Sequence, residues 1–248
     1  MIEIIDIYFV YVVILIFSFL QSFLGVGLLL FGTPTLIIFG YSYVETLWMI
    51  LPSSIIISLT QVIFDKDLIK SKYSIFSFTL PALVIGLVLI LLNSDSINIS
   101  KIVGLGLLLV AIIRQSKGLN LYLSNLISKR PNLYFLFTGL IHGLSNMGGG
   151  PLAILMSSLH QSRAAIRTNI AFVYLFFGIS QIIVLMIFEL ESLDSIYFTF
   201  PLVAIMSYFF IGKPFSRYID DKKYQSSITL VIFIYGILAF IDVGSYIN

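Results

Sequence analysis

Two clusters of glycine, each ending in proline, lie deep inside apolar sequence and are the strongest chemical signal in this chain. The first cluster contains Gly25, Gly27, Gly32 and Pro34, and the second contains Gly143, Gly148, Gly149, Gly150 and Pro151. Proline inside a helix removes a hydrogen bond and clashes with the preceding turn, and neighbouring glycines weaken the helix further. Each cluster therefore predicts a break, and a new half-helix begins near Pro34 or Pro151 because proline fits a first turn.

The start of a half-helix carries free backbone N–H groups and the positive end of the helix dipole, which together attract anions. Two such ends facing each other would make an anion-binding site. The residues that we expect to form it are Gly32, Thr33 and Pro34 from the first cluster, with Asn146, Gly148, Gly149, Gly150 and Pro151 from the second. The alternative is that the glycines only permit close helix packing. Two clusters in equivalent places with the same ending favour the binding site.

Polar side chains inside other apolar segments are weaker candidates for the same site. They are Ser53 and Ser54, which follow Pro52, the glutamines Gln61 and Gln181, and Asn169. Each of them could bind substrate or hydrogen-bond a neighbouring helix, and the sequence does not separate these two roles. Arg167 could supply a positive charge for an anion, but an interfacial anchor whose stem reaches to water is the favoured interpretation.

Enzyme chemistry finds little support in the sequence. His142 lies three residues before Ser145, so a helix would place them on one face, but the chain has no Gly-x-Ser-x-Gly elbow and no third orienting acid. It has no His-Glu-x-x-His site, no P-loop and no cysteine, which leaves no thiolate metal site and no redox motif. We therefore expect a protein that is not an enzyme and holds no cofactor or metal.

The elements that must position these residues are membrane-spanning helices. Of the 248 residues, 59% are hydrophobic and 10% are charged, against about 25% charged in an ordinary soluble domain, and the mean hydropathy is +1.06. This composition excludes soluble enzymes, nucleic-acid-binding proteins and disordered scaffolds. Strand-like alternation is absent, so we expect an all-α polytopic membrane protein with about six to eight spanning helices.

The apolar segments show an internal repeat. They occur at 7–39, 46–64, 73–92, 99–113, 132–158, 168–188, 195–211 and 227–241. Residues 78–81 match 198–201 and residues 60–63 match 180–183 at an offset of 120, and residues 32–34 match 149–151 at an offset of 117. We interpret the chain as two repeats, 1–118 and 119–248. Each repeat comprises three helices and one long segment, broken by its glycine cluster.

The distribution of Lys and Arg indicates how the chain crosses the membrane. If all eight segments span it, each side receives 7 positive charges, which gives no bias. If the two broken segments are instead re-entrant hairpins, 13 positive charges fall inside and only Lys101 falls outside. This second arrangement places both termini outside. With three crossings in each repeat it also gives the repeats opposite orientations, which is the inverted-repeat plan of secondary transporters.

Nearly the whole chain resembles the TauE/SafE family of sulfite exporters and anion permeases. The second half carries the family's Gly-rich break, from Gly143 through residues 146–151, and then Arg167 and Thr168. The first half departs from the family pattern at residues 28–29 and 52–53. The resemblance implies transport of a sulfur-containing anion such as sulfite, thiosulfate, a sulfonate or sulfoacetate. We expect an integral protein of a prokaryotic plasma (inner) membrane that binds this anion near the midplane.

Two transport mechanisms stay open at this point: a carrier with alternating access, and an anion channel in which the same hairpins form a pore. No Asp or Glu lies mid-helix in the apolar segments. Facilitated diffusion, or coupling through the substrate's own proton, is therefore as well supported as a dedicated proton relay. The expected partners are a small anion and the lipid bilayer, with no nucleic acid, and a homodimer is left open.

Overall fold

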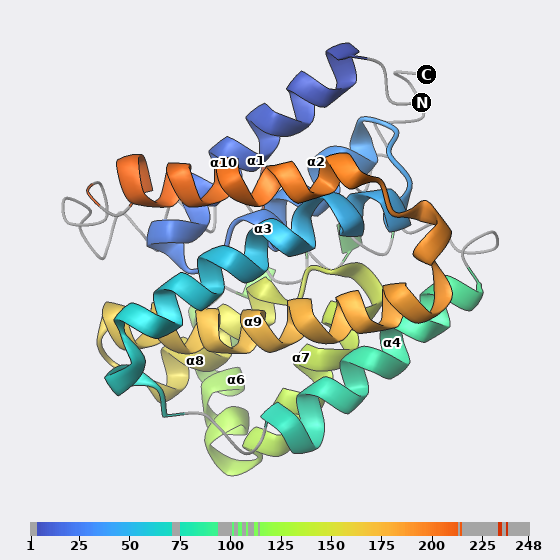
Figure 1. Cartoon of the computed structure of the whole chain (residues 1–248). Helices are drawn as coiled ribbons and strands as arrows, with labels where there is room; N and C mark the ends of the chain where they lie inside the picture. The colour runs from blue at the N-terminus through green and yellow to red at the C-terminus, as the bar shows by residue number, and fades with distance from the viewer. Residues whose placement is uncertain are drawn as a thin grey trace.

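The computed structural model describes residues 4–70, 75–93 and 116–212, together with scattered positions between 101 and 115 and between 214 and 237. The described residues form helices and short connections, with no strand among them (Figure 1). The α-helices are α1 (Ile4–Leu24), α2 (Thr33–Ile38), α3 (Tyr43–Phe64), α4 (Leu80–Leu92), α6 (Lys117–Lys129), α7 (Pro131–Ser145), α8 (Gly149–Leu159), α9 (Arg163–Phe188) and α10 (Phe200–Ser207). The predicted all-α class is confirmed.

Five helical segments in the described part of the chain are long and apolar enough to cross a membrane. They are Ile7–Leu24, Tyr43–Phe64, Ile75–Leu92, Arg163–Phe188 and Ser195–Gly212. Large apolar side chains such as Ile187, Leu202 and Phe210 are exposed on their outer faces, where lipid would cover them. The predicted helices at 99–113 and 227–241 lie largely outside the described residues.

The spanning helices pack against partners that are distant in sequence. α3 lies beside α9, α4 beside α7, and α1 beside α10 (Figure 1). Between α7 and the segment Ile75–Leu92, glycine makes the contact: a Cβ on Gly139 or Gly143 would overlap the carbonyl oxygen of Thr79 or Leu83. The prediction that Gly143 belongs to a helix break is therefore wrong. It lies inside α7 and lets two backbones approach closely.

The first apolar segment is broken at its first two glycines. α1 ends at Leu24, and Gly25 follows with a left-handed backbone at φ +78°, which glycine adopts without strain. A Cβ on Gly27 would overlap the backbone of Phe17 and Gln21. The chain after the break therefore folds back against α1.

The helix after this first break begins earlier than its proline suggests. Helical backbone resumes in a π-helical turn, Leu28–Gly32, which continues directly into α2, with Pro34 as the second residue of α2. The prediction of a half-helix that begins near Pro34 is therefore wrong. A proline ring in an α-helix clashes with the carbonyl four residues earlier, and the wider π-helical turn relieves that clash.

The second apolar segment is broken where its later glycines predict. α7 ends at Ser145, and Asn146 has a left-handed backbone at φ 58°. α8 begins at Gly149 and keeps Pro151 in its first turn, where the missing N–H leaves no acceptor unpaired. The prediction of a half-helix beginning near Pro151 is confirmed.

Candidate functional site

The two helix breaks meet inside the protein. At the second break, Nδ2 of Asn146 donates a hydrogen bond to Oγ1 of Thr33, the first residue of α2, over 2.8 Å. A Cβ on Gly149, the first residue of α8, would lie 3.4 Å from Cβ of Leu30 in the π-helical turn. Thr33 and Asn146 have no exposed surface, so this contact is sealed inside the protein. We call residues 28–33 and 146–150 the two tips.

A chain of hydrogen bonds connects the tips to α9. Nε2 of Gln181 donates to Oδ1 of Asn146 over 3.1 Å, and Nε2 of His142 lies 3.2 Å from Oε1 of Gln181. The N–H of Gly148 donates to Nδ1 of His142 over 3.1 Å. Because Nδ1 accepts, we assign the imidazole proton to Nε2, which then donates to Gln181. We call Thr33, His142, Asn146, Gly148 and Gln181 the tip network.

At the first break, the Gln21 side chain accepts a backbone N–H from the start of the next helix, as the His142 side chain does just before α8 at the second break. Oε1 of Gln21 accepts the N–H of Leu28 over 3.2 Å, and its Nε2 donates to Oγ of Ser54 and to Oγ of Ser58 over 3.2 Å each. Gln21 and His142 each stand four positions before the left-handed residue of their break. Neither residue was among the predicted binding residues, and His142 was considered only with Ser145 for enzyme chemistry. The sequence feature that could have identified them is a polar side chain in an apolar segment, about one helical turn before the glycine cluster breaks the helix.

The N-terminus of α8 faces an unpaired hydroxyl group. The N–H groups of Gly149 and Gly150 lie in a first turn that lacks intrahelical acceptors, and the N-cap residue, Gly148, has no side chain that could accept from them. The Tyr174 side chain of α9 is fully buried, and its Oη has no hydrogen-bond partner among the described residues. A Cβ on Gly149 would overlap this Oη, so the hydroxyl group lies against the helix end. Donors that lack acceptors in a sealed site are suited to an anion.

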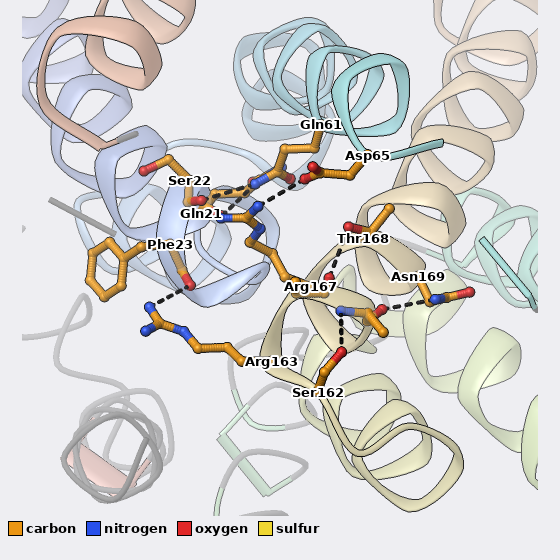
Figure 2. A network of polar contacts seen from close by, with 12 residues as sticks. Gln21, Ser22, Phe23, Gln61, Asp65, Ser162, Arg163, Arg167, Thr168 and Asn169 are labelled. Carbon is orange, nitrogen blue, oxygen red and sulfur yellow. Dashed lines mark hydrogen bonds and ion pairs between the residues drawn. The ribbon is translucent and has the colours of Figure 1, made fainter. Parts of the chain in front are cut away.

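Arg167 and Asn169 lie near the start of α9, beside the ends of α1 and α3 (Figure 2). Nη2 of Arg167 pairs with Oδ2 of Asp65 over 2.8 Å, and the two side chains are 19% and 29% exposed. Asn169 accepts the N–H of Lys70 over 3.0 Å and donates to the carbonyl oxygen of Leu68 over 2.8 Å. These contacts fasten the chain after α3 to α9, and a carboxylate balances the charge of Arg167.

The structure brings some of the predicted binding residues together at the tips and places the others outside the tips. At the tips or in the tip network lie Gly32, Thr33, Asn146, Gly148, Gly149, Gly150 and Gln181, with Pro151 adjoining them. Two others make hydrogen bonds to α1, since Nε2 of Gln61 donates to the carbonyl of Ser22 over 3.1 Å and Ser54 pairs with Gln21. Oγ of Ser53 is buried without a partner among the described residues.

Apolar spanning helices, combined with two broken helices that meet in the interior, place this chain among the helical membrane transport proteins. A family model described as Sulfite exporter TauE/SafE matches residues 10–239. The chain therefore belongs to the TauE/SafE family, whose members are membrane transporters of the sulfite-exporter type, and it is an integral membrane protein. Comparisons with curated proteins and with solved structures found no match.

Proposed function

We propose that the protein is a secondary permease that carries a small sulfur-containing oxyanion or organosulfonate, such as sulfite, thiosulfate or sulfoacetate, through a site between the two tips. The observation that carries this proposal is the start of α8, where the N–H groups of Gly149 and Gly150 lack intrahelical acceptors and the unpaired hydroxyl of Tyr174 lies against Gly149. Membership of the sulfite-exporter family supports the sulfur chemistry. We assign no catalytic role and no cofactor to the site.

The charges around the second tip favour an anion over a cation. The helices α7, α8 and α9 contain no Asp or Glu, so a cation would find no carboxylate there. A partly buried helix N-terminus contributes up to about 2 kcal/mol to the binding of an anion. Together with hydrogen bonds from hydroxyl and amide groups, two tips would support millimolar to micromolar affinity, on the order of 4–8 kcal/mol.

We further propose that the chain forms two inverted repeats, 1–118 and 119–248, in which 7–39 and 132–158 are re-entrant hairpins. Equivalent contacts support the duplication: Gln61 hydrogen-bonds the end of α1, and Gln181, 120 residues later, hydrogen-bonds His142 near the end of α7. The split of 13 positive charges to 1 supports both termini lying outside a prokaryotic plasma membrane.

The closed tips favour a carrier over a channel. Thr33, Asn146 and Gln181 have no exposed surface, so an anion between the tips would be shielded from both sides of the membrane. Transport then requires the tips to part toward one side at a time, and hydrogen bonds such as Asn146 to Thr33 must break and re-form. A pore would instead need a continuous wet path past these residues.

Isothermal titration calorimetry of the purified protein with sulfite, thiosulfate, sulfoacetate and isethionate tests the site. We expect binding of at least one of these anions, and Tyr174→Phe should weaken it about 10-fold or more, because a hydrogen bond to a charged group contributes about 1.5–3 kcal/mol. Tyr122→Phe is the matched control, because the Tyr122 side chain on α6 is 67% exposed. Saturable counterflow in liposomes would identify a carrier.

Two results would contradict the proposal. If none of the four anions binds to the wild-type protein, or if a cation binds instead, the assigned substrate class is wrong. If Tyr174→Phe binds the anion as tightly as the wild type does, the anion does not occupy the start of α8.

A further inference from the structure

His142 joins the tip to α9 through both of its ring nitrogens. It is fully buried, its Nδ1 accepts the N–H of Gly148 over 3.1 Å, and its Nε2 lies 3.2 Å from Oε1 of Gln181. Gly148 directly precedes the first residue of α8, and a Cβ on Gly148 would lie 3.0 Å from Nδ1 of His142. The imidazole thus lies directly against the tip that we assign to the anion.

Adding a proton to His142 would change what this tip can bind. The lone pair of Nδ1 is the group that takes up a second proton, and an imidazolium ring donates from both nitrogens. Nδ1–H would then point at the N–H of Gly148, and this donor–donor pair cannot persist. The Gly148 N–H would be released beside those of Gly149 and Gly150, and the ring would add a positive charge and a further donor to the same place.

A buried imidazolium needs a counter-ion, and the surrounding helices supply none. The described helices α4, α7 and α8 contain no Asp, Glu, Lys or Arg, and the charged residues of α9, Arg163 and Arg167, stand in its first two turns. The one acidic residue of α3, Glu45, is held by Ser42 in the capping box at the start of that helix. α6 carries Lys117 and Lys129 at its two ends and no acidic residue. The other titratable groups near the ring are tyrosines. They are Tyr174, with ring centroids 5.9 Å apart, Tyr43, whose hydroxyl donates to the carbonyl of Gly143 over 3.5 Å, and Tyr134, whose hydroxyl donates to the carbonyl of Pro151 over 3.3 Å.

An uncompensated charge in such a place is strongly unfavourable, so His142 remains neutral while the site is empty. An anion at the start of α8 would provide the missing partner. Protonation and anion binding therefore assist each other, because each lowers the free-energy cost of the other.

We propose that His142 takes up one proton together with each anion, so that the protein carries the proton and the anion in the same direction. The inference rests on the anion site proposed above. The proton comes from water on the side that supplies the anion, binds Nδ1, and is lost to water when the tips open on the other side. No bond to the anion forms. For a singly charged anion the cycle moves no net charge.

Of the two breaks, we expect the second alone to take up a proton. Gln21, which holds the corresponding position, accepts the Leu28 N–H with an amide oxygen and cannot take up a proton at ordinary pH. It also supplies the test variant, since His142→Gln keeps an acceptor for the Gly148 N–H but removes the titratable group. The matched control is His160→Gln, because His160 is the other histidine of the chain and lies just after α8, outside the tip network.

The first test measures proton uptake on binding, using thiosulfate and isethionate because neither changes its charge between pH 5 and 8. Calorimetry in buffers of different ionisation enthalpy should show one proton taken up per anion by the wild type and by His160→Gln. Their affinity should rise as pH falls, at most about 10-fold per pH unit. His142→Gln should bind more weakly, with no proton uptake and no pH dependence. Proton uptake that persists in His142→Gln would overturn the inference.

The second test measures transport and needs no variant. With the membrane potential clamped, uptake of thiosulfate or isethionate into liposomes that contain a pH-sensitive dye should acidify the lumen. Anion uptake by the wild type without acidification would overturn the proton coupling and leave the anion site standing. If the wild type takes up neither anion nor any other sulfur oxyanion, the proposed function fails, and this inference fails with it.

Discussion

Gly149→Ala is the substitution that most directly tests the geometry of the second tip. The added Cβ would overlap Oη of Tyr174, and its next neighbours would be Cζ of Tyr174 at 3.2 Å and Cβ of Leu30 at 3.4 Å. The Tyr174 ring cannot easily move aside, because it is fully buried and its centroid is 5.9 Å from that of His142 and 6.2 Å from that of Phe177. Overpacking of this kind costs about 1–3 kcal/mol.

If this cost of about 1–3 kcal/mol is lost from the free energy of anion binding, the affinity falls by about 5- to 150-fold. Gly32→Ala is the matched control at the first tip, because its Cβ would meet only side-chain atoms at 3.7 Å and beyond. Alanine is also a better helix former than glycine, by about 1 kcal/mol. Gly32→Ala should therefore leave the stability of the protein unchanged or raise it.

Tyr174→Phe provides the rescue, because it removes the atom with which the Gly149→Ala methyl group collides. In the double variant the methyl group would face only ring carbon at 3.2 Å and Leu30 at 3.4 Å, which small shifts can accommodate. The double variant should thus be more stable than the sum of the single variants indicates, with a coupling energy of about 0.5–3 kcal/mol. The rescue is measured as stability, because Tyr174→Phe itself is expected to weaken binding.

The assays are thermal unfolding of the detergent-purified protein and calorimetric titration with thiosulfate. The reasoning is refuted if Gly149→Ala melts and binds like the wild type, or if Gly32→Ala is as damaging as Gly149→Ala. Additive effects of Gly149→Ala and Tyr174→Phe would show that the two side chains do not meet, and that α8 does not begin against the Tyr174 hydroxyl.

Three further predictions concern other parts of the molecule. Arg167→Gln and Asp65→Asn should each lower stability by about 1 kcal/mol and should not add in the double variant, and thermal unfolding measures both effects. A single cysteine at His160, in a chain that has none, should react with a membrane-impermeant maleimide from the cytoplasmic side alone, and labelling from outside intact cells would rule out the re-entrant arrangement. Gly143→Ala should destabilise by about 1–3 kcal/mol because its Cβ would overlap the α4 backbone, whereas Gly118→Ala, with no atom within 4 Å, should change thermal stability little.

The sequence alone was sufficient for the class of protein and for most of the helices that the structure describes. Hydropathy adds up residue by residue along the chain, so a run of apolar residues long enough to span a bilayer can be identified without knowing its neighbours. Helix breaking is also local, which is why the breaks after Leu24 and after Ser145 fall within the predicted glycine clusters. The family could be identified for a related reason, since the motif that carries the resemblance, Asn146–Pro151, is continuous in sequence.

The roles of individual polar residues depended on tertiary structure. Arg167 could not be paired with Asp65, 102 residues away, until α3 and α9 were placed side by side. Gly143 belongs to the same glycine cluster as Gly148, yet it contacts α4 instead of breaking a helix, because the difference lies in what packs against it.

The roles of His142 and Tyr174 at the second tip were not predicted, for the same reason. Neither residue belongs to a recognisable motif, and a buried imidazole or phenol in an apolar helix has no distinctive pattern of neighbours in the sequence. His142 matters because it accepts the Gly148 N–H, and Tyr174 matters because its hydroxyl fills the place that a Cβ on Gly149 would take. Both arrangements exist only after the chain reverses at Asn146. Hydrogen bonds depend on distance and direction between groups, so partners from separate helices are decided by how the helices pack.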